Sequence, residues 1–213
     1  VGSDGKTGDG CGLLFDIDYK FFADTVLKEQ NIEIGEYFAI GQIFYYQDIS
    51  KLLPKIKKIL KSENLVLAAY RKVPVDEKIL GEIAHNCMPE IFQLFIKPFE
   101  KDFNQDVFET GLIQARKYIE EIYMDDNKLY VCSMSSKTVV YKGLMLPNAI
   151  KEFYLDLNKE NFRASTCVFH QRFSTNTSPR WHLAQPFRLL AHNGEINAIR
   201  GNRNWVKARS SKF

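Results

Sequence analysis

Two short polar patches in the C-terminal part of the chain carry residues whose types could do chemistry. They are "HQRFSTNT" (170–177) and "AHNGEIN" (191–197), and each ends an apolar, strand-like stretch. Arg172, in the first patch, can bind a carboxylate through two parallel N–H bonds, which a lysine cannot do. Asn193 and Gly194, in the second, offer a side-chain amide and an unobstructed backbone N–H, the donors that stabilise an oxyanion during acyl transfer. A tight Asn-Gly turn would explain the second patch without any chemistry, so both interpretations stay open on these residues alone.

Three other motifs suggest chemistry, but each has a simpler structural explanation. The Gly-Lys-Thr at 5–7 resembles the end of a phosphate-binding loop, whose first glycine would have to lie before residue 1. Ser174 near His170 could belong to a hydrolytic triad, but the sequence has no G-x-S-x-G elbow to expose the serine. A zinc site would have to use residues with loose spacing: Cys167, His170, His182 and His192. We therefore expect a turn-rich loop and ordinary strand and loop residues at these positions, and no metal.

Composition and charge limit the class of protein. The chain has 213 residues, 45% hydrophobic and 26% charged, as is typical of a globular protein with a sizeable core. It has no run of about 18 apolar residues that could span a membrane, and no secretory signal. Four scattered cysteines without a CxxC pair suit free thiols and the cytoplasm. Residues 163–213 contain nine Lys or Arg and one acid, but these cations stand singly, so we expect an anionic small molecule or an acidic partner domain rather than nucleic acid.

Hydrophobic periodicity predicts an α+β protein with antiparallel sheets, because strands and helices are segregated rather than alternating. The predicted strands cover 12–18, 36–46, 65–75, 89–98, 166–175 and 187–193, with a hairpin over 128–146. The predicted helices cover 20–30, 48–64, 106–123 and 195–209. Pro54 is expected in the first turn of its helix, where a missing N–H costs little.

The same patches, together with two others, resemble the glutaminase domain of glutamate synthase large subunits, a class II glutamine amidotransferase of the N-terminal nucleophile type. The similar stretches are "DGKTGDGCG" near the start, "SMSSKTVVYKG" (133–143) and the long block "HQRFSTNTSPRWHLAQPFRLLAHNGEINAIRGNRNW" (170–205), in the family's order. Residues 20–125 match only in general character. The resemblance implies a four-layer αββα sandwich, with residues 1–213 forming a partial domain that is incomplete at both ends.

The resemblance also implies roles for the residues of both patches. Arg172 would bind the α-carboxylate of L-glutamine, helped by Ser174 and Thr175, and Asn193 and Gly194 would form the oxyanion hole. An N-terminal cysteine thiolate would attack the glutamine amide and release ammonia, with its own α-amino group as the base. In the full-length enzyme the ammonia would reach a region with FMN and an iron–sulfur cluster and react there with 2-oxoglutarate. Electrons would come from a small NAD(P)H-oxidising subunit or from ferredoxin, and the location would be cytoplasmic, or plastid in a photosynthetic eukaryote.

The chain also departs from the family pattern. Residue 1 is a valine, and the resemblance places the family's nucleophilic cysteine further upstream. Cys11 lies in a glycine-rich loop where the family has another small residue. We therefore expect the nucleophile to be absent from these 213 residues, and the fragment alone to be inactive. Two alternatives remain: an inactive domain of this fold that binds a partner, and another class II amidotransferase. His192 is expected to be a structural loop residue.

Overall fold

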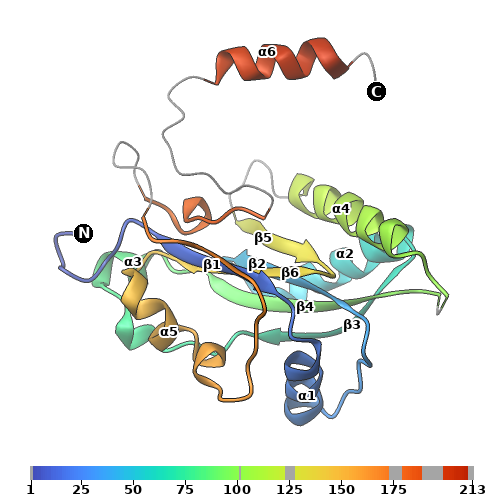
Figure 1. Ribbon diagram of the computed structural model, residues 1–213, viewed down its shortest axis with the longest axis horizontal. Helices are drawn as coiled ribbons and strands as arrows, with labels where there is room; N and C mark the ends of the chain where they lie inside the picture. Colours follow the sequence, from blue (N-terminus) through green and yellow to red (C-terminus); the bar gives the residue numbers. More distant parts are fainter. Residues whose placement is uncertain (1, 101, 123–127, 173–178, 189–198, 211–213) are drawn as a thin grey trace.

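Two antiparallel sheets and the helices around them form the protein in a computed structural model (Figure 1). The structure describes residues 2–100, 102–122, 128–172, 179–188 and 199–210. The strands are β1 (Cys11–Asp16), β2 (Ala39–Tyr45), β3 (Leu65–Lys72), β4 (Glu90–Pro98), β5 (Leu129–Ser135), β6 (Thr138–Gly143) and β7 (Cys167–His170). The helices are α1 (Tyr19–Gln30), α2 (Ile49–Ser62), α3 (Glu82–Asn86), α4 (Gln105–Glu121), α5 (Ile150–Phe153) and α6 (Arg200–Arg209), and short 3-10 helices include Leu155–Asn158 and Trp181–Leu183.

The two strands predicted within 128–146 are present, but the expectation that they pair as a hairpin is wrong, because each strand pairs in a different sheet. One sheet has the strand order β3-β4-β2-β5 and the other has the order β6-β1-β7. Because β5 lies in the first sheet and β6 in the second, the turn between them carries the chain from one layer to the other. In the smaller sheet, Gly12 of β1 is paired with Lys142 of β6 on one side and with His170 of β7 on the other. This register brings the three sequence blocks that resemble the amidotransferase family onto one sheet.

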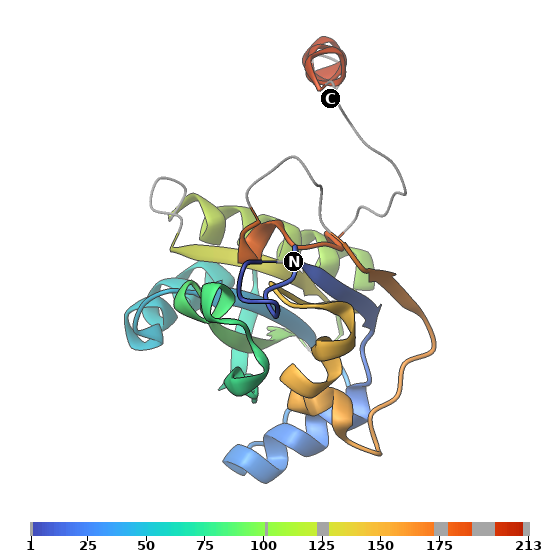
Figure 2. The same cartoon turned by 90° about the vertical axis from the view of Figure 1, so that its left-hand side faces the viewer.

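Apolar side chains form two cores on either side of the four-stranded sheet. The larger core lies between the sheets, where Phe15 and Tyr141 of the small sheet meet Phe44 and Phe95 of the large one. The second core lies between the four-stranded sheet and the helices α2 and α4, which share one side of it (Figures 1 and 2). The described residues thus show three successive layers, which are α2 with α4, the four-stranded sheet and the three-stranded sheet. The predicted α+β class and the sandwich of antiparallel sheets are confirmed.

Helix α2 shows how the sequence sets these elements. The Asp48 side chain accepts the Ser50 backbone N–H at 2.9 Å and caps the helix, as the sequence indicated. The apolar residues at 52, 53, 56, 59 and 60 were expected to face the core: Leu52, Ile56 and Leu60 are buried, and Leu53 and Ile59 are partly buried against it. Pro54, however, is the sixth residue of the helix, so the expectation that it lies in the first turn is wrong. The helix continues past Pro54 because its packed apolar face outweighs the lost hydrogen bond.

A network of buried polar side chains crosses the space between the sheets. Arg71 of β3 forms an ion pair with Asp156, and both side chains are 2% exposed. The Arg71 Nε–H also donates to Gln93 Oε1 of β4 at 2.8 Å. Tyr141 of β6 donates its hydroxyl proton to Asp156 Oδ2 at 2.9 Å and accepts from Gln93 Nε2 at 2.7 Å. The network therefore ties three strands from both sheets to the 3-10 helix that carries Asp156.

Each helix and strand predicted upstream of residue 166 has a counterpart in the structure, with boundaries that differ by a few residues. The strand predicted at 166–175 is shorter, ending at His170, and its last residues lie outside the described ranges, as does most of the strand predicted at 187–193. The helix predicted at 195–209 is present as α6, which lies apart from the sheets and buries none of its residues (Figures 1 and 2). The short helices α3 and α5 were not predicted. No helix within the described ranges is long and apolar enough to cross a membrane.

Candidate functional site

Arg172 lies just beyond β7, beside the glycine-rich loop that precedes β1. The pairing of Gly12 with His170 aligns the two segments, and two residues later the Arg172 Nε is 3.8 Å from the Asp9 Oδ2. The Arg172 side chain is 67% exposed, so its guanidinium group is open to a ligand from solvent. A long contact between exposed charges holds the arginine only weakly, and a carboxylate ligand could replace it with two closer N–H bonds.

Hydrogen bonds to the Asp4 side chain hold the glycine-rich loop next to Arg172 in its conformation. The Asp4 carboxylate accepts the backbone N–H groups of Thr7 at 2.8 Å and Ile83 at 3.1 Å, together with the Thr7 hydroxyl. These hydrogen bonds, with the Thr7 hydroxyl first, hold the pKa of Asp4 well below its usual range. Gly8 has no room for a side chain, since a Cβ there would lie 2.1 Å from the Met145 carbonyl oxygen. The loop has no helix after it, so the phosphate-loop alternative fails and the expected turn-rich loop is confirmed.

The segment 181–188 leads along the chain toward Asn193 and Gly194, and it is attached at both ends. Trp181 is buried, and its indole N–H donates to the Ala84 carbonyl oxygen at 3.0 Å. At the other end, Arg188 donates to the Val131 carbonyl oxygen at 2.7 Å. This segment therefore brings the chain to a defined point on β5, five residues before Asn193.

Most of the predicted site residues lie outside the described ranges. Ser174 and Thr175 fall within 173–178, and Asn193 and Gly194 fall within 189–198. Their roles in substrate binding and in the oxyanion hole stay predictions. The structure places Arg172 alone among the five, beside the glycine-rich loop.

The four cysteines are free thiols, and none has the lowered pKa of an activated nucleophile. Cys11 is a buried residue of β1, and burial raises the pKa of its thiol to about 12. Burial likewise raises the pKa of Cys132 to about 12, while the exposed Cys87 and Cys167 also have raised pKa values, chiefly through partial burial. Cys11 therefore does not substitute for the family's N-terminal cysteine.

The zinc alternative gains no support from the described residues, which contain no group of three or more His, Cys, Asp or Glu able to hold a metal ion. His182 is partly buried, and burial lowers its pKa. His192 lies outside the described ranges.

The sequence analysis missed three charged residues in and around the segment 181–188. Lys142 is fully buried in β6, and its Nζ donates to the His182 carbonyl oxygen at 2.8 Å. Arg188 forms an ion pair with Glu120 of α4, with 3.1 Å between Nη2 and Oε1. A lysine inside the apolar alternation of "TVVYKG" was the one signal in the sequence for the first of these residues. The ion pair between Arg188 and Glu120 joins residues 68 positions apart in the sequence, and local sequence patterns do not reveal such a contact.

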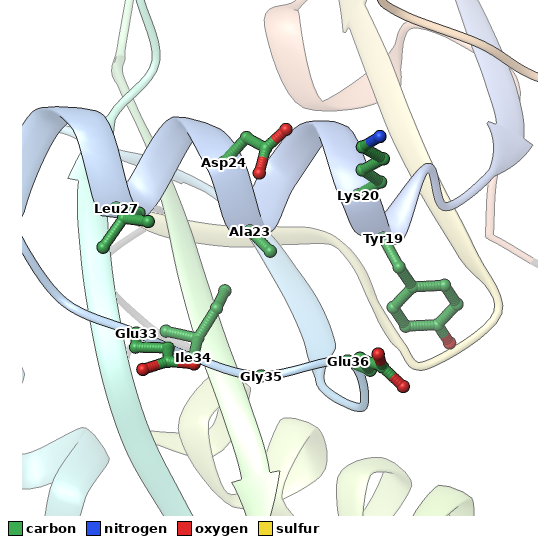
Figure 3. Close-up of a pocket in the computed structure, with 9 residues that line it drawn as sticks. All are labelled: Tyr19, Lys20, Ala23, Asp24, Leu27, Glu33, Ile34, Gly35 and Glu36. Atoms are coloured by element: carbon green, nitrogen blue, oxygen red, sulfur yellow. The ribbon is translucent and has the colours of Figure 1, made fainter.

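A pocket of about 540 Å³ lies between α1 and the segment 33–36 (Figure 3). Ala23 and Leu27 of the helix face Ile34 across it, and the carboxylates of Asp24 and Glu33 stand at its rim. None of the residues that line it was predicted to bind glutamine, and its excess of carboxylates does not suit an α-carboxylate ligand.

Comparison with known proteins assigns the family. The model of the class II glutamine amidotransferase family matches residues 1–213. The chain is 40% identical to the ferredoxin-dependent glutamate synthase 1 of Arabidopsis thaliana, covering 100% of the chain and 13% of that protein. It is 38% identical to the large chains of the NADPH glutamate synthases of Azospirillum brasilense and Bacillus subtilis, covering 100% of the chain and 14% of each protein. The chain thus spans a small part of the curated relatives it matches. It belongs to the class II glutamine amidotransferases, the N-terminal nucleophile family whose sandwich of sheets it shares.

Proposed function

We propose that this chain is part of the glutamine-hydrolysing domain of a glutamate synthase large subunit, which makes glutamate from L-glutamine and 2-oxoglutarate. The observation that carries the proposal is 37–40% identity to glutamate synthases along almost the whole chain. This range includes the segment 20–125, whose sequence resembled the family only in general character. The match favours a glutamate synthase over other class II amidotransferases.

In the proposed site, Arg172 binds the α-carboxylate of glutamine. Its exposed guanidinium group and its place beside the glycine-rich loop support this role, since a bound carboxylate would meet no bulky side chain from the glycines. Ser174 and Thr175 assist in binding. Asn193 and Gly194 donate to the oxygen of the amide carbonyl as it becomes an oxyanion, an interaction worth about 3–4 kcal/mol when well aimed.

The nucleophile is proposed to be the N-terminal cysteine of the family, because each of the chain's four thiols has a raised pKa. Its thiolate attacks the side-chain carbonyl, ammonia leaves, and water hydrolyses the thioester to glutamate. The FMN and iron–sulfur cluster of such enzymes are proposed for other regions, since the four cysteines here lie on separate elements and do not form a cluster ligand set.

Relatives that use ferredoxin, NADPH and NADH are similar to this chain at 40%, 38% and 39% identity, so the proposal covers all three electron donors. A small NAD(P)H-oxidising subunit would be the partner with a nicotinamide donor, and ferredoxin the partner otherwise. We propose a cytoplasmic location, or a plastid in a photosynthetic eukaryote.

The test uses the full-length protein that contains this chain. Purified protein is supplied with glutamine alone, and then with glutamine, 2-oxoglutarate and each reductant in turn, while ammonia and glutamate are measured. We expect glutamine hydrolysis, and two glutamates for each glutamine when 2-oxoglutarate and the right reductant are present. A protein that releases no ammonia and forms no glutamate from glutamine would instead be the inactive, partner-binding alternative.

A further inference from the structure

Lys142 is a buried lysine with unusual surroundings. Its side chain is 0% exposed, and its Nζ lies 4.6 Å from the centre of the Tyr130 ring and 4.9 Å from that of Phe187. The Nζ donates to the His182 carbonyl oxygen at 2.8 Å, and it is 3.4 Å from the Tyr130 hydroxyl. In the part of the chain that the structure describes, no carboxylate oxygen lies within ion-pair distance of this ammonium group. A buried cation of this kind is costly, so its position calls for a reason beyond packing.

The Lys142 ammonium group joins β5, through Tyr130, to the segment 181–188. His182 and Phe187 belong to that segment, and the lysine touches it near both ends. The segment packs directly on the backbone of Gly12, the residue paired with Lys142. A Cβ on Gly12 would lie 2.5 Å from the Gln185 carbonyl oxygen and 2.6 Å from the Lys142 Cβ. The lysine stem and the segment backbone therefore fit together over a position where only glycine leaves room.

We propose that Lys142 is a positioning residue that fixes the segment 181–188, and through it the oxyanion donors Asn193 and Gly194. The inference rests on the proposed function, because those two residues follow Arg188 by five and six positions in the chain. A cation between two aromatic rings and a carbonyl oxygen holds a backbone segment in one place, and amide hydrolysis depends on where its donors point.

The charge of Lys142 supports this role. Burial lowers the pKa of Lys142 from its usual range to about 8. Because the folded pKa lies below the unfolded one, the buried ammonium group lowers stability below pH 8, and this cost disappears as the pH rises toward the unfolded pKa. Replacing such a cation by an apolar chain of similar length should leave stability equal or higher, as holds for other buried charges. A residue that lowers stability is typical of sites where function and stability trade off.

The groups that face Lys142 do not share its titration range. Burial raises the pKa of Tyr130 and of Cys132 on β5 above that of the lysine, and burial lowers the pKa of His182 from its usual range. Arg188 forms an ion pair with Glu120. Within this described cluster, a charge change near pH 8 therefore belongs to Lys142.

The experiment compares Lys142→Met with the wild type in the full-length protein. The matched control is Lys137→Met, which changes an exposed lysine in the turn between β5 and β6. Steady-state glutaminase kinetics, the melting temperature at pH 7 and deuterium uptake of the peptide 181–188 are measured for all three proteins. We expect Lys142→Met to lower kcat roughly 10–100-fold, as losses of orienting contacts do, while KM changes less than about 2-fold. Uptake in 181–188 should rise, the melting temperature should not fall, and the control should match the wild type.

The results test the role of Lys142 and the proposed glutaminase function separately. Unchanged uptake in 181–188, or a lower melting temperature that accompanies the loss of kcat, would overturn Lys142 as a positioning residue. Faster uptake in a protein that never hydrolyses glutamine would instead contradict the proposed function. The wild type gives a second readout: kcat should fall as pH rises through about 8, the opposite direction to the deprotonation of an α-amino base. An alkaline fall that persists in Lys142→Met would also overturn the inference.

Discussion

Asp156→Asn tests the buried polar network that holds the two sheets together. The Asp156 carboxylate accepts from Arg71 and from the Tyr141 hydroxyl, and its side chain is 2% exposed. The substitution keeps the shape of the side chain but removes its charge, so the Arg71 guanidinium stays buried without its main counter-ion. The loss of folding stability in this variant therefore measures the ion pair and not the effect of a cavity.

The expected loss of stability follows from the burial of the Arg71–Asp156 ion pair and from Glu29, an acid that remains beside Arg71. Breaking a buried ion pair by removing one partner typically costs about 3–5 kcal/mol. Glu29 lies 3.4 Å from Arg71 and is 43% exposed, so it offsets part of the lost charge. We therefore expect the lower end, about 3 kcal/mol. For a chain of this length, that loss lowers the melting temperature by roughly 6–12 °C.

The assay is thermal and urea unfolding of Asp156→Asn, with Glu90→Gln as the control. Glu90 pairs with Lys72 at 2.6 Å, but these side chains are 46% and 51% exposed, so the control should cost less than about 1 kcal/mol. Equal shifts for Asp156→Asn and Glu90→Gln would refute the view that burial makes the first pair important.

Three further predictions concern the core, the thiols and the oxyanion hole. Trp181→Ala should destabilise the protein by about 3–5 kcal/mol in urea unfolding, because the ring is 1% exposed, whereas Trp205→Ala, at a ring 66% exposed, should cost under about 0.5 kcal/mol. In the native 213-residue chain at pH 8, a thiol reagent should label the two exposed cysteines and spare the two buried ones, and fast labelling of all four would contradict the packing of β1 and β5. Asn193→Ala should lower kcat for glutamine about 100-fold or more in the full-length protein, and near-normal turnover would remove Asn193 from the oxyanion hole.

Local sequence patterns predicted the elements well because each pattern has a local cause. Asp48 marked the start of α2 through a cap, and the alternation around 129–143 marked the strands β5 and β6. Their pairing as a hairpin was predicted wrongly, because each strand pairs with a strand that is distant in the sequence. Pro54 was misplaced because the preference of proline for the first turn is a local tendency that tertiary packing can override, and here the apolar face of α2 packs on a sheet.

The long-range contacts of the site lay beyond local patterns. The contact between Asp9 and Arg172 depends on the pairing of β1 with β7, whose residues are more than 150 positions apart. The surroundings of Lys142 require β5, β6 and the segment 181–188 together, and the sequence showed only a lysine in an apolar strand. The candidate site residues came from the motif resemblance, because residue type and spacing alone favoured a simple turn at Asn193 and Gly194.

The KM for glutamine of Arg172→Lys in the full-length protein tests the central claim most directly. Lysine keeps the positive charge but loses the two parallel N–H bonds to the α-carboxylate. The loss of one charge-assisted hydrogen bond, worth roughly 1.5–3 kcal/mol, should raise KM about 10–100-fold while kcat changes much less. An unchanged KM for glutamine would contradict the assignment of Arg172 as the carboxylate-binding residue of a glutaminase site.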